Sequence, residues 1–344
     1  MIRKSVKIGE GSIEAIRGAV LCRDLSVEQG EQTTTFRRGT TVDDALIATL
    51  NTRAGTSLEV VVAEPGELSQ GEASLRAAQA LAGSGVQVAP PHQGQCVLRA
   101  AQHGLLRIDQ MAIRGANRTG VLLVATGLDG RVVRQGDTLA IVKAAHLWVD
   151  ESALERTLAP IASVSALRVA PFQRRKAAFL AGQRIRPANF EAAQANLRAT
   201  LAQFGVELVA QKYLLRDNPS EIDEAIQCSL AQGAEIILIA GSILLDPEDP
   251  YVRAAQKLPA VSLETGAPID PGTMFWVADN GQAILFGLAS CELYGRLSIL
   301  DLLLPYAIAK ERIDRPLLAE LGYGGLLEQT FLARRSVLDH PGDR

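Results

Sequence analysis

A short loop after an aliphatic run contains residue types that could bind an anion or a metal ion. The run ends at Gly241 and Ser242, and the carboxylates of Asp246 and Asp249 then precede Pro250. Glycine lets a ligand approach the backbone closely, and a helix opening at Pro250 would direct free N–H groups toward an anion. Two carboxylates would repel that anion unless a divalent cation bridges them or unless they only cap the helix. Two interpretations therefore stay open: Asp246 and Asp249 as catalytic or metal-binding residues, and Asp249 as a helix N-cap.

The second half of the chain alternates strands and helices in a way that would place this loop at the edge of a sheet. The apolar pattern predicts strands at Lys176–Ala181, Val206–Leu215 and Glu235–Ala240, with helices at Asn189–Phe204 and after Asn218. Such βαβαβ units are right-handed and build a parallel sheet with helices on its faces. Ligands of these sheets bind outside the carboxyl ends of the strands. The Gly241–Ser242 loop therefore lies where a ligand site is expected.

Two further loops follow predicted strands in the same half. One is the turn Asp270-Pro271-Gly272, which has Pro and Gly where turns favour them. The other is the small-residue loop Gly287–Cys291, which contains Ser290 and precedes a leucine-rich helix. Four arginines near these loops favour a small anionic ligand: Arg184, Arg186, Arg253 and Arg296. The alternative is that these arginines are ordinary solvated surface residues.

Composition limits the classes of function. The chain has 344 residues, of which 47% are hydrophobic, and a formal charge of −3 with acids and bases interspersed. Nucleic acid and membranes are not expected partners, because the chain has no extended basic field and no polybasic patch. The absence of a long apolar run and of a secretory h-region predicts a cytoplasmic location. Four cysteines without a CxxC pair and four scattered histidines argue against a zinc site or a disulfide framework.

The pattern of the chain changes near residue 170. Before it, short strand-like runs alternate with loops rich in Gly and Pro, and helical stretches are few. We therefore expect a β-rich N-terminal region at 1–169, an α/β domain at 170–315 and a C-terminal extension at 316–344. The predicted fold class is α/β, with a mostly parallel sheet in three layers and a smaller β-rich N-terminal domain.

The order of these stretches resembles the molybdopterin-binding domain of molybdenum-cofactor biosynthesis proteins, most closely a bacterial variant often fused to a nucleotidyltransferase. The family's Ser and two Asp after the third strand are matched by Ser242, Asp246 and Asp249. Its Gly-Met-Pro-Val-Asp-Pro-Gly turn is matched by Gly266, Pro268, Asp270, Pro271 and Gly272, and its last loop by Gly287, Cys291 and Asp301. An N-terminal family stretch is matched by Gly94, Leu98, Ala100, Gly104, Leu105 and Asp109.

The resemblance implies a ligand, partners and a set of site residues. The ligand would be molybdopterin or the molybdenum cofactor, a pterin with a terminal phosphate, with magnesium as a companion ion. The chain would act in cofactor biosynthesis or delivery to a molybdoenzyme, as an insertase-like protein or carrier; an enzyme of this kind would resemble a molybdopterin adenylyltransferase or molybdenum insertase. Homo-oligomers are common in the family. The implied cofactor-binding residues are Gly241, Ser242, Asp270, Pro271, Gly272, Gly287, Ser290, Cys291, Arg296 and Asp301, and the implied catalytic and metal-binding residues are Asp246 and Asp249.

Several positions depart from the family pattern. Gln95 and Val97 replace an Arg and an Asn, Ala289-Ser290 replaces Pro-Gly, and Leu293 replaces an Arg. These changes favour an alternative, in which the site has decayed to a binding or regulatory module for another phosphorylated metabolite or a protein partner. A third interpretation, a generic nucleotide-binding enzyme, has no support, because the sequence contains no P-loop and no GxGxxG motif. We expect the protein to bind better than it catalyses.

Overall fold

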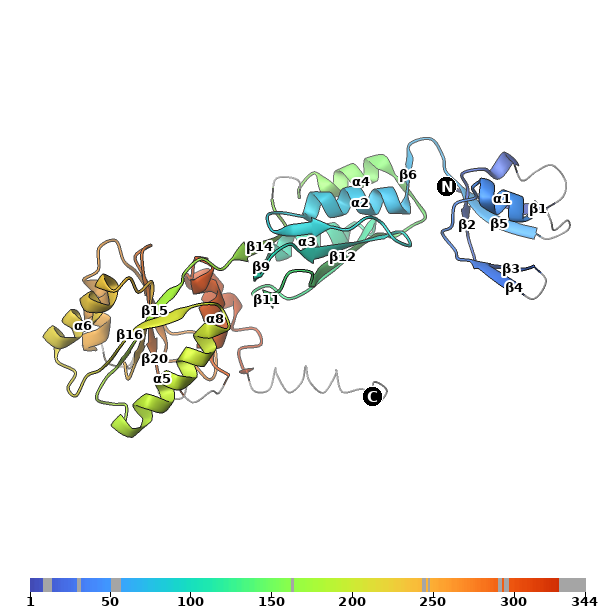
Figure 1. Cartoon of the computed structure of the whole chain (residues 1–344). Helices are drawn as coiled ribbons and strands as arrows, with labels where there is room; N and C mark the ends of the chain where they lie inside the picture. The colour runs from blue at the N-terminus through green and yellow to red at the C-terminus, as the bar shows by residue number, and fades with distance from the viewer. Residues whose placement is uncertain are drawn as a thin grey trace. The chain divides into compact units, whose positions relative to one another are not determined.

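The computed structural model describes residues 1–8, 14–29, 32–50, 57–161, 164–242, 246, 248–289, 293 and 297–327. The chain divides into two compact units, Met1–Ala170 and Pro171–Arg344, which are coloured blue to green and green to red in Figure 1. The first unit is nearly as long as the second.

The first part of the first unit is a small sheet with one covering helix. Its strands have the order β1-β5-β2, and they are β1 (Ile2–Lys7), β5 (Ser57–Val62) and β2 (Val20–Leu21). A hairpin of β3 (Leu25–Gln29) and β4 (Gln32–Phe36), the short helix η1 (Glu14–Ile16) and α1 (Asp44–Leu50) complete this part. Leu46, Ile47 and Leu50 on α1 share a core with Val60 of the sheet.

The rest of the first unit is built around a four-stranded sheet. Its order is β10 (Leu122–Thr126), β12 (Thr138–Ala144), β8 (Gln95–Ala100) and β7 (Val86–Val88). The smaller sheets contain β11 (Val132–Val133), β9 (Gly104–Ile108) and β14 (Leu167–Pro171), and β13 (Trp148–Asp150) with β6 (Glu67–Ser69). The helices are α2 (Gln70–Leu81), α3 (Gln110–Arg118) and α4 (Glu151–Leu158). The sequence predicted few helices here, and α2 is hard to recognise because Ala73, Ala77 and Ala78 form much of its buried face.

The second unit contains one six-stranded sheet. Its order is β16 (Glu207–Tyr213), β15 (Lys176–Ala181), β17 (Ile236–Ala240), β20 (Ile284–Leu288), β19 (Trp276–Asp279) and β18 (Ser262–Thr265). The first four strands pair in parallel, whereas β19 is antiparallel to both β20 and β18. Parallel strands end at the same edge, which we call the carboxyl edge. The register places Ala181, Ala240 and Leu288 side by side there.

Helices lie on both faces of this sheet. The helices that the structure describes in this unit are α5 (Pro187–Ala202), α6 (Pro219–Ala231), α7 (Pro250–Gln256), α8 (Ile299–Ile308) and α9 (Arg315–Glu320). Ile222 and Ile226 of α6 share a core with Leu180, whereas Phe190 of α5 stacks on Phe179 at 5.4 Å between ring centroids. Neighbouring residues of a strand point to opposite faces, so α5 and α6 cover opposite sides of the sheet (Figure 1).

Candidate functional site

Two of the loops that the sequence singled out lie at the carboxyl edge, and most of the third lies outside the described residues. The loop after β17 begins at Gly241, whose N–H donates to Leu288 O at the end of β20 at 3.2 Å. The turn at Pro271 accepts a hydrogen bond from Ile299 N, the first residue of α8, also at 3.2 Å. The backbone therefore joins the first loop to the end of β20 and joins the second loop to the helix that follows β20.

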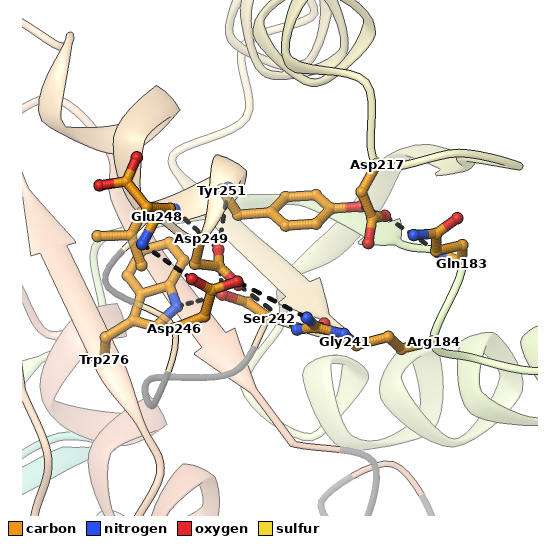
Figure 2. Close-up of polar contacts among 11 residues, drawn as sticks. Gln183, Arg184, Asp217, Gly241, Ser242, Asp246, Glu248, Asp249, Tyr251 and Trp276 are labelled. Atoms are coloured by element: carbon orange, nitrogen blue, oxygen red, sulfur yellow. Dashed lines mark hydrogen bonds and ion pairs between the residues drawn. The ribbon is translucent and has the colours of Figure 1, made fainter.

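Asp249 is the centre of a polar cluster in the first loop (Figure 2). It is the N-cap of α7, and its Oδ1 accepts hydrogen bonds from Tyr251 N at 3.0 Å and Val252 N at 3.2 Å. The same oxygen accepts the Ser242 hydroxyl at 2.9 Å. The residue is fully buried, so these donors and the positive end of α7 hold its charge inside the protein. The capping interpretation of Asp249 is therefore confirmed.

Ser242 is buried beside Asp249 and is bonded on both sides. Its Oγ accepts the indole N–H of Trp276 at 2.7 Å while it donates to Asp249. Gly287 does not lie in a loop, as the sequence predicted, but inside β20 directly opposite Trp276 of β19. A Cβ at Gly287 would overlap the Trp276 indole, so the missing side chain makes room for that ring.

Tyr251 extends the cluster toward the loop that follows β16. Its hydroxyl donates to Asp217 Oδ1 at 2.8 Å, and Gln183 N donates to the same oxygen at 3.1 Å. Burial raises the pKa of Tyr251 well above its usual value, and the hydrogen bond to Asp217 and the charges of Asp217 and Asp249 raise it further. The phenol therefore stays protonated and joins α7 to the loops after β15 and β16.

Arg184 faces both carboxylates of the first loop (Figure 2). Its Nη1 lies 3.7 Å from Asp249 Oδ2, and its Nη2 lies 4.0 Å from Asp246 Oδ2. Asp246 also accepts Glu248 N on Oδ1 at 2.9 Å, which fixes the turn before α7. The Arg184 and Asp246 side chains are 39% and 41% exposed, so solvent reaches this ion pair.

The second loop contributes an exposed carboxylate and a tightly packed glycine. Asp270 is exposed, and within the described residues its side chain makes no hydrogen bond or ion pair. Its backbone is held by Gly325 O, which accepts Asp270 N at 2.8 Å, and by Leu327 N, which donates to Asp270 O at 3.0 Å. Gly272 has φ of +132° and packs against Ile299, where a Cβ would clash.

Asp301 stands at the start of α8 and has a structural role. It forms a capping box with Ser298, accepting Ser298 N on Oδ2 at 2.8 Å. Three other predicted site residues, Ser290, Cys291 and Arg296, lie outside the described residues. The ligand-binding roles of all these residues stay predictions.

The two carboxylates were also predicted to bind magnesium. Within the described parts of the chain, no three His, Cys, Asp or Glu side chains are grouped so that they could hold a metal ion. Asp249 Oδ1 already accepts three hydrogen bonds, and the Oδ2 atoms of Asp249 and Asp246 face the Arg184 guanidinium. A divalent cation between them would therefore have to displace Arg184. The magnesium role stays a prediction.

Some residues of the cluster were not recognised from sequence. Asp217 was read only as part of a helix start, and Tyr251 and Trp276 were not singled out. Asp217 does follow a predicted strand, and that position was a usable signal. Trp276 had no such signal, because its partner Ser242 is 34 residues away and the strand β19 was not predicted.

No protein-family model matches the chain, and no curated protein matches its sequence. Among solved structures, the molybdopterin biosynthesis enzyme MoaB from Thermus thermophilus is 17% identical, with a TM-score of 0.31, over 38% of this chain and 91% of that one. The tungsten cofactor synthesizing protein MoaB from Pyrococcus furiosus is 13% identical, with a TM-score of 0.32, over 42% and 100%. CinA from Thermoplasma acidophilum, a protein with unknown function, is 13% identical, with a TM-score of 0.31, over 40% and 99%. At these values the likenesses do not identify a ligand for this chain.

None of the helices in the described ranges is long and apolar enough to cross a membrane.

Proposed function

We propose that the second unit binds a phosphorylated pterin of the molybdopterin type at the carboxyl edge of its sheet. The observation that carries the proposal is the convergence of the matched stretches, because Asp249, Asp270 and Asp301 come from three separate segments that follow strands at this edge. The backbone bonds from Gly241 to Leu288 and from Ile299 to Pro271 support a single composite site. Ligands of parallel sheets bind at this edge.

Binding is a better-supported role than catalysis. Ser242 is 1% exposed and Asp249 is fully buried, so both side chains are used inside the protein. Leu293, which replaces a family Arg, is 1% exposed and belongs to the core. Catalysis needs charged groups held against the transition state, whereas binding can rest on backbone N–H groups and a few side chains. We therefore propose a carrier role that delivers the pterin to a molybdoenzyme, with the protein acting as a homo-oligomer.

A second candidate is a module for another phosphorylated metabolite or a protein partner. The burial of Ser242 and Leu293 favours it, because these positions correspond to ligand-binding positions of the family. A module for another phosphorylated metabolite would share an anionic ligand at the carboxyl edge with the first candidate and would differ in the group that is attached to the phosphate.

The test is whether the protein carries a pterin when it is made in a host that synthesises molybdopterin. We expect pterin fluorescence after oxidation of the purified wild-type protein, and none from a host unable to make molybdopterin. Asp270→Ala should lower the pterin content without destabilising the protein, because the Asp270 side chain is exposed. Glu207→Ala is the control, since Glu207 is an exposed carboxylate at the start of β16, at the opposite edge. A folded wild-type protein free of pterin would contradict the pterin proposal.

A further inference from the structure

We propose that Arg184 is the side chain that binds the phosphate of the ligand, and that Asp246 and Asp249 hold its guanidinium until the phosphate replaces them. The proposal rests on the proposed binding of a phosphorylated ligand at the carboxyl edge. It adds the cation that recognises the ligand, and it gives the two carboxylates a role as competitors of the phosphate.

The position of Arg184 suits this role. It follows Gly182 and Gln183 in the loop after β15, and its side chain extends toward the loop after β17 (Figure 2). β15 lies between β16 and β17 in the sheet, so its loop is flanked by the loops of both neighbours. The guanidinium therefore lies within the carboxyl edge, where a ligand is expected.

The contacts of Arg184 are too long for a closed ion pair. Guanidinium and carboxylate groups that bind each other in a fork lie at about 2.7–2.9 Å. The distances here are 3.7 Å to Asp249 and 4.0 Å to Asp246. Within the described residues Arg184 makes one hydrogen bond, from Nη1 to Gly241 O at 3.4 Å. An arginine has five N–H donors, so donors remain for a phosphate, which the guanidinium fork fits well.

Groups other than Arg184 also stabilise the buried carboxylate of Asp249. Tyr251 N, Val252 N and the Ser242 hydroxyl all donate to its Oδ1. The positive end of α7 also stabilises its negative charge. The guanidinium can therefore turn toward a ligand without leaving a buried carboxylate that has no compensating donors.

Two other arginines of this unit, Arg253 and Arg315, bind other partners, and a third, Arg186, offers a control. Arg253 pairs with Glu248, and Arg315 pairs with Glu264 and donates to Thr265 O and Gly266 O. Arg186, two residues after Arg184, is exposed, and its side chain makes no capping bond to α5. Arg186→Gln therefore removes the same charge from the same loop without touching the carboxylate pair.

The experiment measures the affinity of the full chain for inorganic phosphate by calorimetric titration, in buffer with EDTA and in buffer with magnesium. Arg184→Gln should weaken binding tenfold or more, and Arg184→Lys should weaken it less, because lysine keeps the charge and loses the fork. Arg186→Gln should change the affinity by less than threefold. Equal losses for Arg184→Gln and Arg186→Gln would overturn the proposal, since they would show a general effect of charge.

Asp246→Asn separates competition from metal bridging. The asparagine keeps an oxygen that can accept Glu248 N, and it removes one negative charge next to Arg184. Competition predicts a two- to fivefold gain in phosphate affinity in both buffers. A loss of affinity that occurs only with magnesium would show that the carboxylates bind a metal ion, and it would overturn the proposal.

The two proposals can fail separately. If the protein carries no pterin but binds phosphate through Arg184, the phosphate-binding role stands and the pterin proposal fails. If the protein carries pterin and Arg184→Gln retains both the pterin and the phosphate affinity, the pterin proposal stands and the role of Arg184 is overturned. Thermal melting of each variant shows that the binding results come from folded protein.

Discussion

Trp276 and Ser242 are joined by a buried hydrogen bond of 2.7 Å from the indole N–H to the serine oxygen. Ser242 in turn donates to Asp249, the N-cap of α7. A continuous chain of hydrogen bonds therefore runs from β19 through the loop after β17 to α7. A predicted ligand-binding hydroxyl is thus part of the internal support of the candidate site.

A double-mutant cycle tests this chain. Ser242→Ala leaves the Trp276 N–H without its acceptor, and we expect it to lower the free energy of unfolding by about 1–3 kcal/mol. Trp276→Phe removes the donor, and the two changes together should show a coupling of about 1 kcal/mol in urea unfolding. The control is Ser229→Ala, because the buried Ser229 hydroxyl bonds to Ala225 O within α6. Additive effects for Ser242 and Trp276 would contradict the chain.

Gly287 gives a second prediction about the same support. A methyl group at this position would overlap the Trp276 indole, so Gly287→Ala should destabilise the second unit by about 1–3 kcal/mol through overpacking. The matched change is Gly115→Ala in α3, where no atom lies within 4 Å of the added Cβ. That variant should be more stable by about 0.5–1 kcal/mol, because alanine is the better helix former. Melting curves that show no loss for Gly287→Ala would disprove the packing argument.

The sequence predicted the central strands well, because their signal is local. β15 was predicted at Lys176–Ala181 and is observed there, and β17 begins one residue after the predicted start at Glu235. Both strands are aliphatic and almost entirely buried, so their apolar runs stand out. The cap at Asp249 could also be predicted, since an Asp directly before Pro250 is a local pattern.

The sequence predicted a strand before the Asp270 turn but not the bounds of β18, and it did not predict β19, because the pairing of these strands decides their structure. β18 (Ser262–Thr265) is a four-residue edge strand with three polar residues, and it has no clear apolar alternation. Without β19, nothing indicated that an indole would fill the space beside Gly287. The contacts of Arg184 with Asp246 and Asp249 also join residues more than 60 positions apart. Such contacts depend on the order of strands in the sheet.

The raised pKa of Tyr251 predicts that the protein loses stability at alkaline pH. Its pKa is raised by burial and by Asp217, so the folded protein keeps the phenol protonated where the unfolded chain loses the proton. The contribution of Tyr251 to stability is therefore complete below about pH 10, the ordinary tyrosine pKa, and falls as the pH rises above it. For one such group, the free energy of unfolding falls by at most about 1.4 kcal/mol per pH unit.

The measurement compares the wild-type protein with Tyr251→Phe in urea unfolding from pH 8 to pH 11. At pH 8 the variant should be less stable by about 1–3 kcal/mol, because Asp217 loses a partly buried hydrogen bond. The difference should shrink above pH 10, since only the wild-type protein has this titrating phenol. Tyr323→Phe is the control, because Tyr323 is fully exposed and its replacement should leave the profile unchanged. A constant difference across this range would show that the phenol does not titrate as described.

Asp249 and Asp246 should differ sharply in their effect on stability. Asp249→Ala removes the N-cap of α7 and the acceptor of the Ser242 hydroxyl, so the free energy of unfolding should fall by about 2 kcal/mol or more. Asp249→Asn should be milder, because the amide oxygen can accept the same hydrogen bonds and asparagine caps well. Asp246→Asn should stay within about 0.5 kcal/mol of the wild-type value, as is usual for a partly exposed surface residue.

Urea unfolding midpoints of the three variants test this order, and the phosphate titration on the same samples separates stability from binding. Asp249 is buried, and three hydrogen bonds and the Arg184 guanidinium contact its carboxylate. Asp246 faces solvent and Arg184. The expected result is therefore a large loss of stability at Asp249 and a gain in phosphate affinity at Asp246. Equal losses of stability for Asp249→Ala and Asp246→Asn would mean that the cap at Asp249 contributes little, and that the carboxylates act as an equivalent pair.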